Sequence, residues 1–190
     1  MRKSVVVAIL VGAWLGFTAV ATAGDVKDVK KGKVVVYDDC DPTDENWDET
    51  GGCTLDGGKV TEAEFSLLLF SPLGDGTVIG HPAWRMEPSY LRLKPDGRLI
   101  AENEGGRTHT FTEVASFGGG FVPPLNGPLL VMAPECATAT PIQPGEEQEF
   151  EGLEPGNHLF QCCIHPWMRF LVKVNAGEEQ KATSGHHGHH

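Results

Sequence analysis

Positive charge is scarce in this chain of 190 residues. Its 15 lysines and arginines stand against 26 aspartates and glutamates, which gives a formal net charge of −11. A surface with this excess of acid repels the phosphates of nucleic acids and the headgroups of anionic lipids. The composition therefore excludes nucleic acid as an expected partner, and it favours a cationic protein partner or simple solubility.

Long apolar runs are also scarce, because only the run from Val5 to Val20 approaches the length of a membrane span. It follows Met1-Arg2-Lys3 and precedes Ala21-Thr22-Ala23, the order found in a secretory signal peptide. A transmembrane anchor is the alternative, but the run is short for a ~20-residue span and contains two glycines. We predict a signal peptide over residues 1–23 and an exported protein, periplasmic or extracellular, without stable membrane insertion.

Motifs for phosphate or calcium binding are lacking as well. The run Phe117-Gly118-Gly119-Gly120-Phe121 has neither the lysine nor the following helix of a phosphate loop. The acidic residues from Asp41 to Glu49 do not have the spacing of an EF-hand loop, and Pro42 interrupts them. We expect a flexible turn in the first segment and a solvated acidic loop in the second.

What the chain does have is the stretch Gln-Cys-Cys-Ile-His-Pro-Trp-Met at residues 161–168. It places a thiolate, an imidazole and a thioether within seven residues, at Cys162, His165 and Met168. Thiolate and thioether suit Cu(I), and imidazole suits both oxidation states of copper. A cysteine, two histidines and a weak axial methionine form the trigonal site of copper electron carriers, so three of four such ligands are present here.

The strand that leads into this loop indicates which cysteine is the ligand. Side chains alternate between the two faces of a strand, so Cys162 shares a face with Phe160 and Cys163 points the other way. Cys162 is therefore the expected ligand. The second imidazole must come from elsewhere, and His109, within another strand-like run, is the best placed.

The chain has five cysteines, and an odd number leaves one thiol unpaired in an oxidising compartment. Cys40 and Cys53 flank the acidic loop and form the natural local pair. If Cys162 binds a metal, Cys136 and Cys163 remain for a second disulfide. Four cysteines allow three pairings, and this one is our expectation.

The remaining sequence alternates short strand-like segments with proline and glycine. Strands are expected at residues 33–37, 89–94, 98–102, 108–111, 147–150, 157–162 and 170–174. Thr61 to Glu64 fits a capping box before the apolar run from Phe65 to Phe70, so a short helix is expected there. This spacing predicts an all-β antiparallel sandwich or barrel, with Pro95-Asp96-Gly97 as a stop between two strands.

These ligand-bearing segments resemble those of cupredoxins of the plastocyanin and amicyanin kind. The likeness is carried by Thr108-His109-Thr110-Phe111 and by the run from Pro155 to Met168, whose Cys-x-x-His-x-x-Met loop is most similar to amicyanin. It implies a cupredoxin-like Greek-key β-sandwich and one type 1 copper bound by His109, Cys162, His165 and Met168. It also implies that the edge of His165 reaches the surface within an apolar patch that includes Pro166.

The resemblance divides the chain into four expected parts. After the signal peptide come an acidic N-terminal extension with a short helix at residues 24–80, a cupredoxin domain at 81–175 and a flexible His-rich tail at 176–190. Four imidazoles near the end of the tail could bind copper weakly. A purification tag is the alternative explanation of these histidines.

Other metal chemistries fit these residues less well. A dinuclear purple copper centre needs two bridging cysteines with three residues between them, a multicopper oxidase flanks its copper cysteine with histidines, and a nitrite reductase needs a further three-histidine site. Zinc would suit Cys162, Cys163, His165 and His109 but would leave Met168 without a purpose. We therefore expect a one-electron carrier with a redox protein partner, not an enzyme. The alternatives are a copper carrier or storage protein and a structural module whose site is empty.

Overall fold

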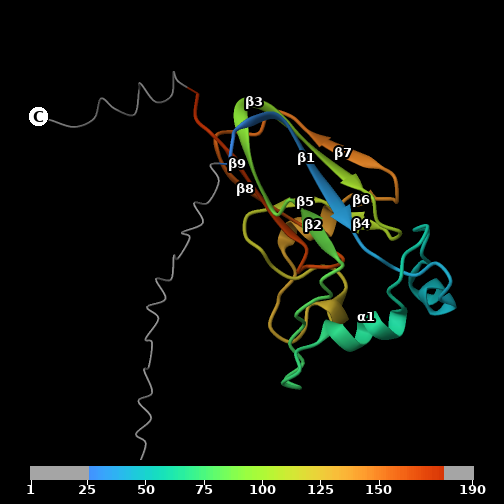
Figure 1. Ribbon diagram of the computed structural model, residues 1–190. Coiled ribbons are helices and arrows are strands. Elements are labelled where there is room, and N and C mark those ends of the chain that lie inside the picture. Colours follow the sequence, from blue (N-terminus) through green and yellow to red (C-terminus); the bar gives the residue numbers. More distant parts are fainter. Residues whose placement is uncertain (1–25, 178–190) are drawn as a thin grey trace, which may run out of the picture.

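The computed structural model describes residues 26–177, which form a β-sandwich with one α-helix beyond one end (Figure 1). The strands are β1 Val29–Tyr37, β2 Arg85–Glu87, β3 Tyr90–Asn103, β4 His109–Thr110, β5 Thr112–Val114, β6 Pro141–Ile142, β7 Glu147–Phe150, β8 Gly156–Gln161 and β9 Arg169–Val174. The helix is α1 Glu62–Leu69, and short 3-10 helices span Glu45–Thr50, Pro123–Leu125 and Pro134–Thr138. The all-β class with a short helix is confirmed.

The expected parts at the two ends of the chain, residues 1–23 and 176–190, lie wholly or largely outside the described residues. The expected signal peptide lies outside the described residues, and so do the histidines of the C-terminal tail. Within residues 26–177, none of the helices has the length and the apolar character that crossing a membrane requires.

Strand β3 belongs to both layers of the sandwich. Its first part, Tyr90–Leu93, pairs with β9, and its later part pairs with β1 and β7. The prediction that Pro95-Asp96-Gly97 ends a strand is therefore wrong. The pairing with β1 jumps from Val29↔Leu93 to Lys31↔Arg98, so the intervening residues of β3 bulge out of the ladder. Proline, which lacks a backbone N–H, is tolerated at such a bulge.

The sheet is mixed, whereas the strand spacing predicted antiparallel pairing. The strand order is β2-β1-β3-β9-β8-β5, with β7 also paired to β3, and the pairs β1–β3 and β3–β9 are parallel. Parallel partners are not joined by a tight turn, so no local signal specifies them. The division of the chain at residue 80 stays a prediction, but β1, which precedes it, is an inner strand of the same sheet.

Aromatic side chains from both layers form the core. The rings of Phe111 and Phe160 stack with centroids 4.5 Å apart, and Phe150 of β7 packs 5.0 Å from Phe160. Along β9, buried Phe170 and Val172 alternate with more exposed residues. Burial of each such side chain contributes roughly 1.5–3 kcal/mol. This core fixes the end of β8, from which the loop with the candidate ligands begins.

Helix α1 begins as its sequence predicts. Thr61 is the N-cap, and its hydroxyl accepts a hydrogen bond from the backbone N–H of Glu64 at 3.2 Å. The helix ends at Leu69, three residues before Pro72. It buries Phe65 and Leu69 against the sandwich.

Asp44 connects this helix to the acidic loop. Its carboxylate accepts hydrogen bonds from the backbone N–H groups of Glu62 (2.7 Å) and Asn46 (3.2 Å). The bond from Glu62 is the main cause that lowers the pKa of Asp44 below its ordinary value of 3.8. An aspartate with a lowered pKa stabilises the fold above its unfolded-state pKa, and this contribution is lost as the pH falls through the folded-state pKa.

We therefore expect Asp44→Asn, which keeps a capping oxygen, to be less stable than the wild type at neutral pH. The difference should shrink as the pH falls below about 4, because the wild-type carboxylate then becomes neutral as well. Urea unfolding at several pH values measures this. Asp48→Asn, at an exposed position of the same 3-10 helix, is the matched control. A stability difference that is the same at neutral and acid pH would contradict the prediction.

Candidate metal centre

Strand β4 and the loop between β8 and β9 bring three of the four expected ligands together. His109 lies on β4, which pairs with β6, while Cys162 and His165 lie in the loop. The Sγ atom of Cys162 is 3.7 Å from Nδ1 of His109 and 3.7 Å from Nδ1 of His165. The two Nδ1 atoms are 3.2 Å apart. All three side chains are buried.

This triangle has the size of a metal site. The point in its plane that is equally far from the three atoms lies about 2 Å from each of them. This agrees with the lengths of metal–nitrogen and metal–sulfur bonds in zinc sites, about 2.0–2.1 and 2.3 Å. One thiolate and two imidazoles are also the planar donor set of a trigonal copper site. The geometry and the donor types therefore both fit a single transition-metal ion, and its identity stays a prediction.

The Cys162 sulfur is prepared to act as a thiolate. It accepts hydrogen bonds from the backbone N–H groups of Thr110 and His165, each at 3.4 Å. Burial alone would raise the pKa of this thiol, but contacts with His109 and His165 outweigh burial and place the pKa well below its ordinary value. A thiolate is the form that binds metals.

Met168 closes the loop. Its side chain is buried, its N–H donates to the carbonyl of His165, and its carbonyl accepts from the N–H of Cys162. These two bonds fix the residue next to the start of β9. The role of Met168 as the axial ligand stays a prediction.

Asp38 lies behind His109, and the sequence analysis gave it no role. Its Oδ2 is 2.8 Å from Nε2 of His109, and neither side chain is exposed to solvent. Burial alone would lower the pKa of His109, but Asp38 and Cys162 raise it to about 9. Burial would raise the pKa of Asp38, yet His109 and two backbone N–H groups lower it. Asp38 directly follows β1 and stands just before the acidic loop from Asp41 to Glu49, so its sequence pattern resembled that of a solvated loop.

Both expected disulfides are confirmed. Cys40 pairs with Cys53, and Cys136 pairs with Cys163. Of the five cysteines, all of which lie within residues 26–177, Cys162 alone is free.

Two backbone contacts hold the loop in place at Cys163. The N–H of Cys163 donates to Oγ1 of Thr110 at 2.7 Å, which ties the loop to β4. Gly120 also packs against this segment, because a Cβ there would lie 1.9 Å from the Cys163 carbonyl oxygen. The turn around Gly120 therefore has a fixed packing partner next to the site.

The implied exposed edge of His165 is not observed, because aromatic side chains surround its ring. His165 is only 5% exposed, and Pro166 is buried. The ring centroids of Phe65 and Trp84 lie 6.4 Å from that of His165, and the centroid of Trp167 lies 5.4 Å away. Phe65 comes from α1 and Trp84 directly precedes β2, so the chain before residue 85 contributes much of this cover.

The other described histidines have separate environments. His81 is buried, stacks on Phe65 at 5.9 Å and accepts a hydrogen bond from the N–H of Ala83. His158 contacts the carboxylate of Glu113 at 2.6 Å and lies outside the three-residue cluster. The structure thus places neither histidine among the candidate ligands.

Comparison with known proteins gives only distant similarities. No protein-family model matches this chain, and no curated protein matches it. Among solved structures, a purple cupredoxin from Nitrosopumilus maritimus is 15% identical over 76% of this chain and 99% of its own, with a TM-score of 0.40. A reduced amicyanin mutant is 20% identical over 47% of this chain and 71% of its own, with a TM-score of 0.33. These scores are too low to carry an argument, so the assignment below rests on the site.

Proposed function

We propose that this protein is an exported mononuclear type 1 copper protein that acts as a one-electron carrier and not as an enzyme. The observation that carries the proposal is the triangle of one sulfur and two nitrogen atoms from Cys162, His109 and His165. Copper bound there would exchange one electron between Cu(I) and Cu(II).

The side chains around the site have defined roles in this proposal. Cys162 would supply the thiolate, and His109 and His165 would supply the two imidazole nitrogens. The backbone N–H groups of Thr110 and His165 orient the sulfur, and the aromatic rings around His165 exclude water. Donors held by a strand and by a loop with fixed hydrogen bonds change position little when the charge of the site changes, which favours fast electron exchange.

The acidic composition supports a redox protein partner with a cationic surface. Opposite charges accelerate the encounter of two proteins, and the effect weakens as salt screens them. The same charge argues against nucleic acid as a partner. We therefore expect the rate of electron exchange with a cationic partner to fall as ionic strength rises.

A copper carrier or storage protein is the second candidate, and the His-rich C-terminal sequence favours it. Addition of one equivalent of Cu(II) to the exported chain distinguishes the two functions. An intense copper–thiolate absorption and reversible voltammetry at constant copper content support the electron carrier. Rapid transfer of copper to a chelating acceptor supports the copper carrier. A weak ligand-field absorption alone would show that Cys162 does not bind the copper, and it would contradict both functions.

Met168→Leu tests the axial position. We expect this variant to keep the copper–thiolate absorption and to raise the reduction potential, because a site with one donor fewer and an apolar side chain in its place favours Cu(I), the ion of lower charge. Met86→Leu is the matched control, since Met86 is a buried methionine of β2. Voltammetry of the two variants gives the comparison. An unchanged or lowered potential in Met168→Leu would remove Met168 from the ligand set.

A further inference from the structure

Asp38 is a buried carboxylate in direct contact with a proposed ligand. Its Oδ2 meets Nε2 of His109 at 2.8 Å and accepts the N–H of Arg107 at 3.0 Å. Its Oδ1 accepts the N–H groups of Gly106 at 3.0 Å and Cys40 at 3.3 Å. Each carboxylate oxygen therefore has two partners.

These partners determine the charge of Asp38. Three of them are backbone N–H groups, which can only donate. The fourth is His109, whose Nδ1 faces Cys162. Nε2 of His109 carries a proton both when Nδ1 binds a metal and when the ring is doubly protonated. A neutral carboxyl group would have a proton with no acceptor among these four partners. The surroundings of Asp38 are thus those of a carboxylate anion.

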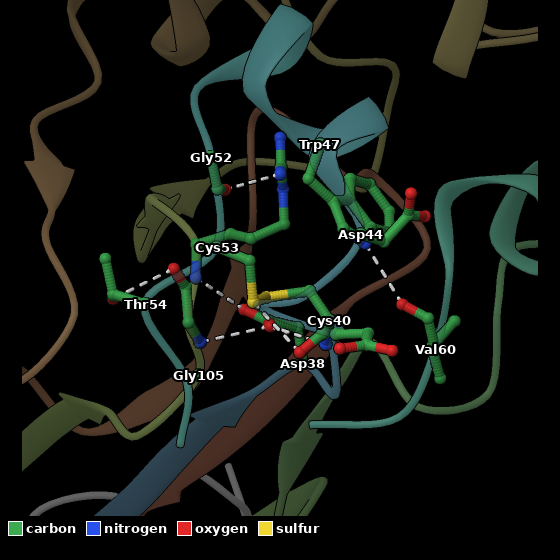
Figure 2. The surroundings of a disulfide bond; sticks show 12 residues. Asp38, Cys40, Asp44, Trp47, Gly52, Cys53, Thr54, Val60 and Gly105 are labelled. Atoms are coloured by element: carbon green, nitrogen blue, oxygen red, sulfur yellow. Dashed lines mark hydrogen bonds between the residues drawn. A yellow bond between two sulfur atoms is a disulfide. The ribbon is translucent and has the colours of Figure 1, made fainter. Parts of the chain in front are cut away.

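The chain provides a specific place for this anion. Figure 2 shows Asp38 beside the Cys40–Cys53 disulfide and Gly105. A Cβ at Gly105 would lie 2.2 Å from Oδ2 of Asp38, so a residue with a side chain there would displace the carboxylate. Asp38 itself follows the last residue of β1, Tyr37, which fixes it relative to the sheet. The position of Asp38 is therefore fixed by the end of β1, by the neighbouring disulfide and by the turn at Gly105.

We propose that Asp38 is a positioning residue that holds His109 with Nδ1 toward the metal and stabilises the oxidised site by its negative charge. The proposal rests on the proposed function. A carboxylate that accepts the second ring N–H of a histidine fixes the tautomer and increases the basicity of the ligand nitrogen. The anion also lies in a buried region, where its interaction with the additional positive charge of Cu(II) is weakly screened.

Asp38→Asn tests this proposal in the full exported chain, with copper as the probe. Replacement of such a carboxylate costs typically about 10–100-fold in metal affinity. We expect this loss to fall mainly on Cu(II), so that Cu(II) affinity decreases about tenfold more than Cu(I) affinity. A tenfold difference corresponds to a rise of about 59 mV in the one-electron reduction potential. Competition with chelators measures the two affinities, and voltammetry measures the potential.

Asp39→Asn is the matched control. It makes the same chemical change one residue away, at a half-buried position, and should leave the potential within a few millivolts of the wild type. If Asp38→Asn weakens both oxidation states equally and leaves the potential unchanged, Asp38 only supports the Gly106–Arg107 turn and the proposal is wrong. A wild-type protein without the copper–thiolate absorption would instead overturn the proposed function, so the two failures are distinguishable.

A second measurement does not require the variant to fold. Wild-type protein loaded with Cu(I) is diamagnetic, and nuclear magnetic resonance can observe the Nε2 proton of His109. We expect this proton to exchange slowly with solvent, because it is buried and donated to Asp38. A His109 ring that lacks a proton on Nε2, or whose Nε2 proton exchanges as fast as that of His158, would overturn the proposal.

Discussion

Replacement of Cys162 by alanine is expected to abolish the copper–thiolate absorption of the Cu(II)-loaded protein completely. The other four cysteines are joined in disulfides, so no second thiolate can replace the one that is lost. Affinity for Cu(II) should also fall by more than the roughly 10–100-fold that changes to residues behind the ligands cost. Visible spectroscopy and chelator competition measure the two effects.

The matched control is His158→Gln, which alters a histidine outside the triangle. It should leave the absorption intact. Cys162→Ser retains a small polar side chain and should also lose the absorption, which separates the loss of sulfur from a loss of folding. An intense band that survives in either Cys162 variant, with folding intact, would show that the thiolate assignment is wrong.

Removal of the Cys136–Cys163 disulfide is expected to have the largest effect on stability. This bridge joins residues 27 positions apart, and the entropy of closing such a loop corresponds to about 3–4 kcal/mol of free energy of unfolding. Urea unfolding of Cys136→Ala/Cys163→Ala measures it. The copper–thiolate absorption should persist, because the backbone N–H of Cys163, and not its sulfur, binds Thr110.

The double variant Cys40→Ala/Cys53→Ala is the comparison for this experiment. Its loop is shorter, with a separation of 13, so the expected loss is slightly smaller, about 3 kcal/mol. A loss below about 1 kcal/mol in the Cys136/Cys163 variant would mean that packing of the loop, and not the covalent link, stabilises this region.

The local elements of the fold could be predicted because their signals are short-range. The strands β7 and β8 and the N-cap of α1 follow from alternation and capping within a few residues of sequence. The continuous β3 and the parallel pairing of β1 could not be predicted in this way. Pro95-Asp96-Gly97 has the composition of a turn, and only the partners of β3 on both sides keep it within one bulged strand.

The sequence by itself indicated the candidate donor types and the positions of three candidate ligands, because Cys162, His165 and Met168 lie within one loop whose spacing limits their separation. It also indicated which cysteine faces the core, since the alternation of β8 is a local property. The tertiary structure alone decided what surrounds these ligands. Asp38 and the rings of Phe65 and Trp84 come from chain segments far from the loop. Such contacts follow from the packing of whole elements, which no pattern of neighbouring residues specifies.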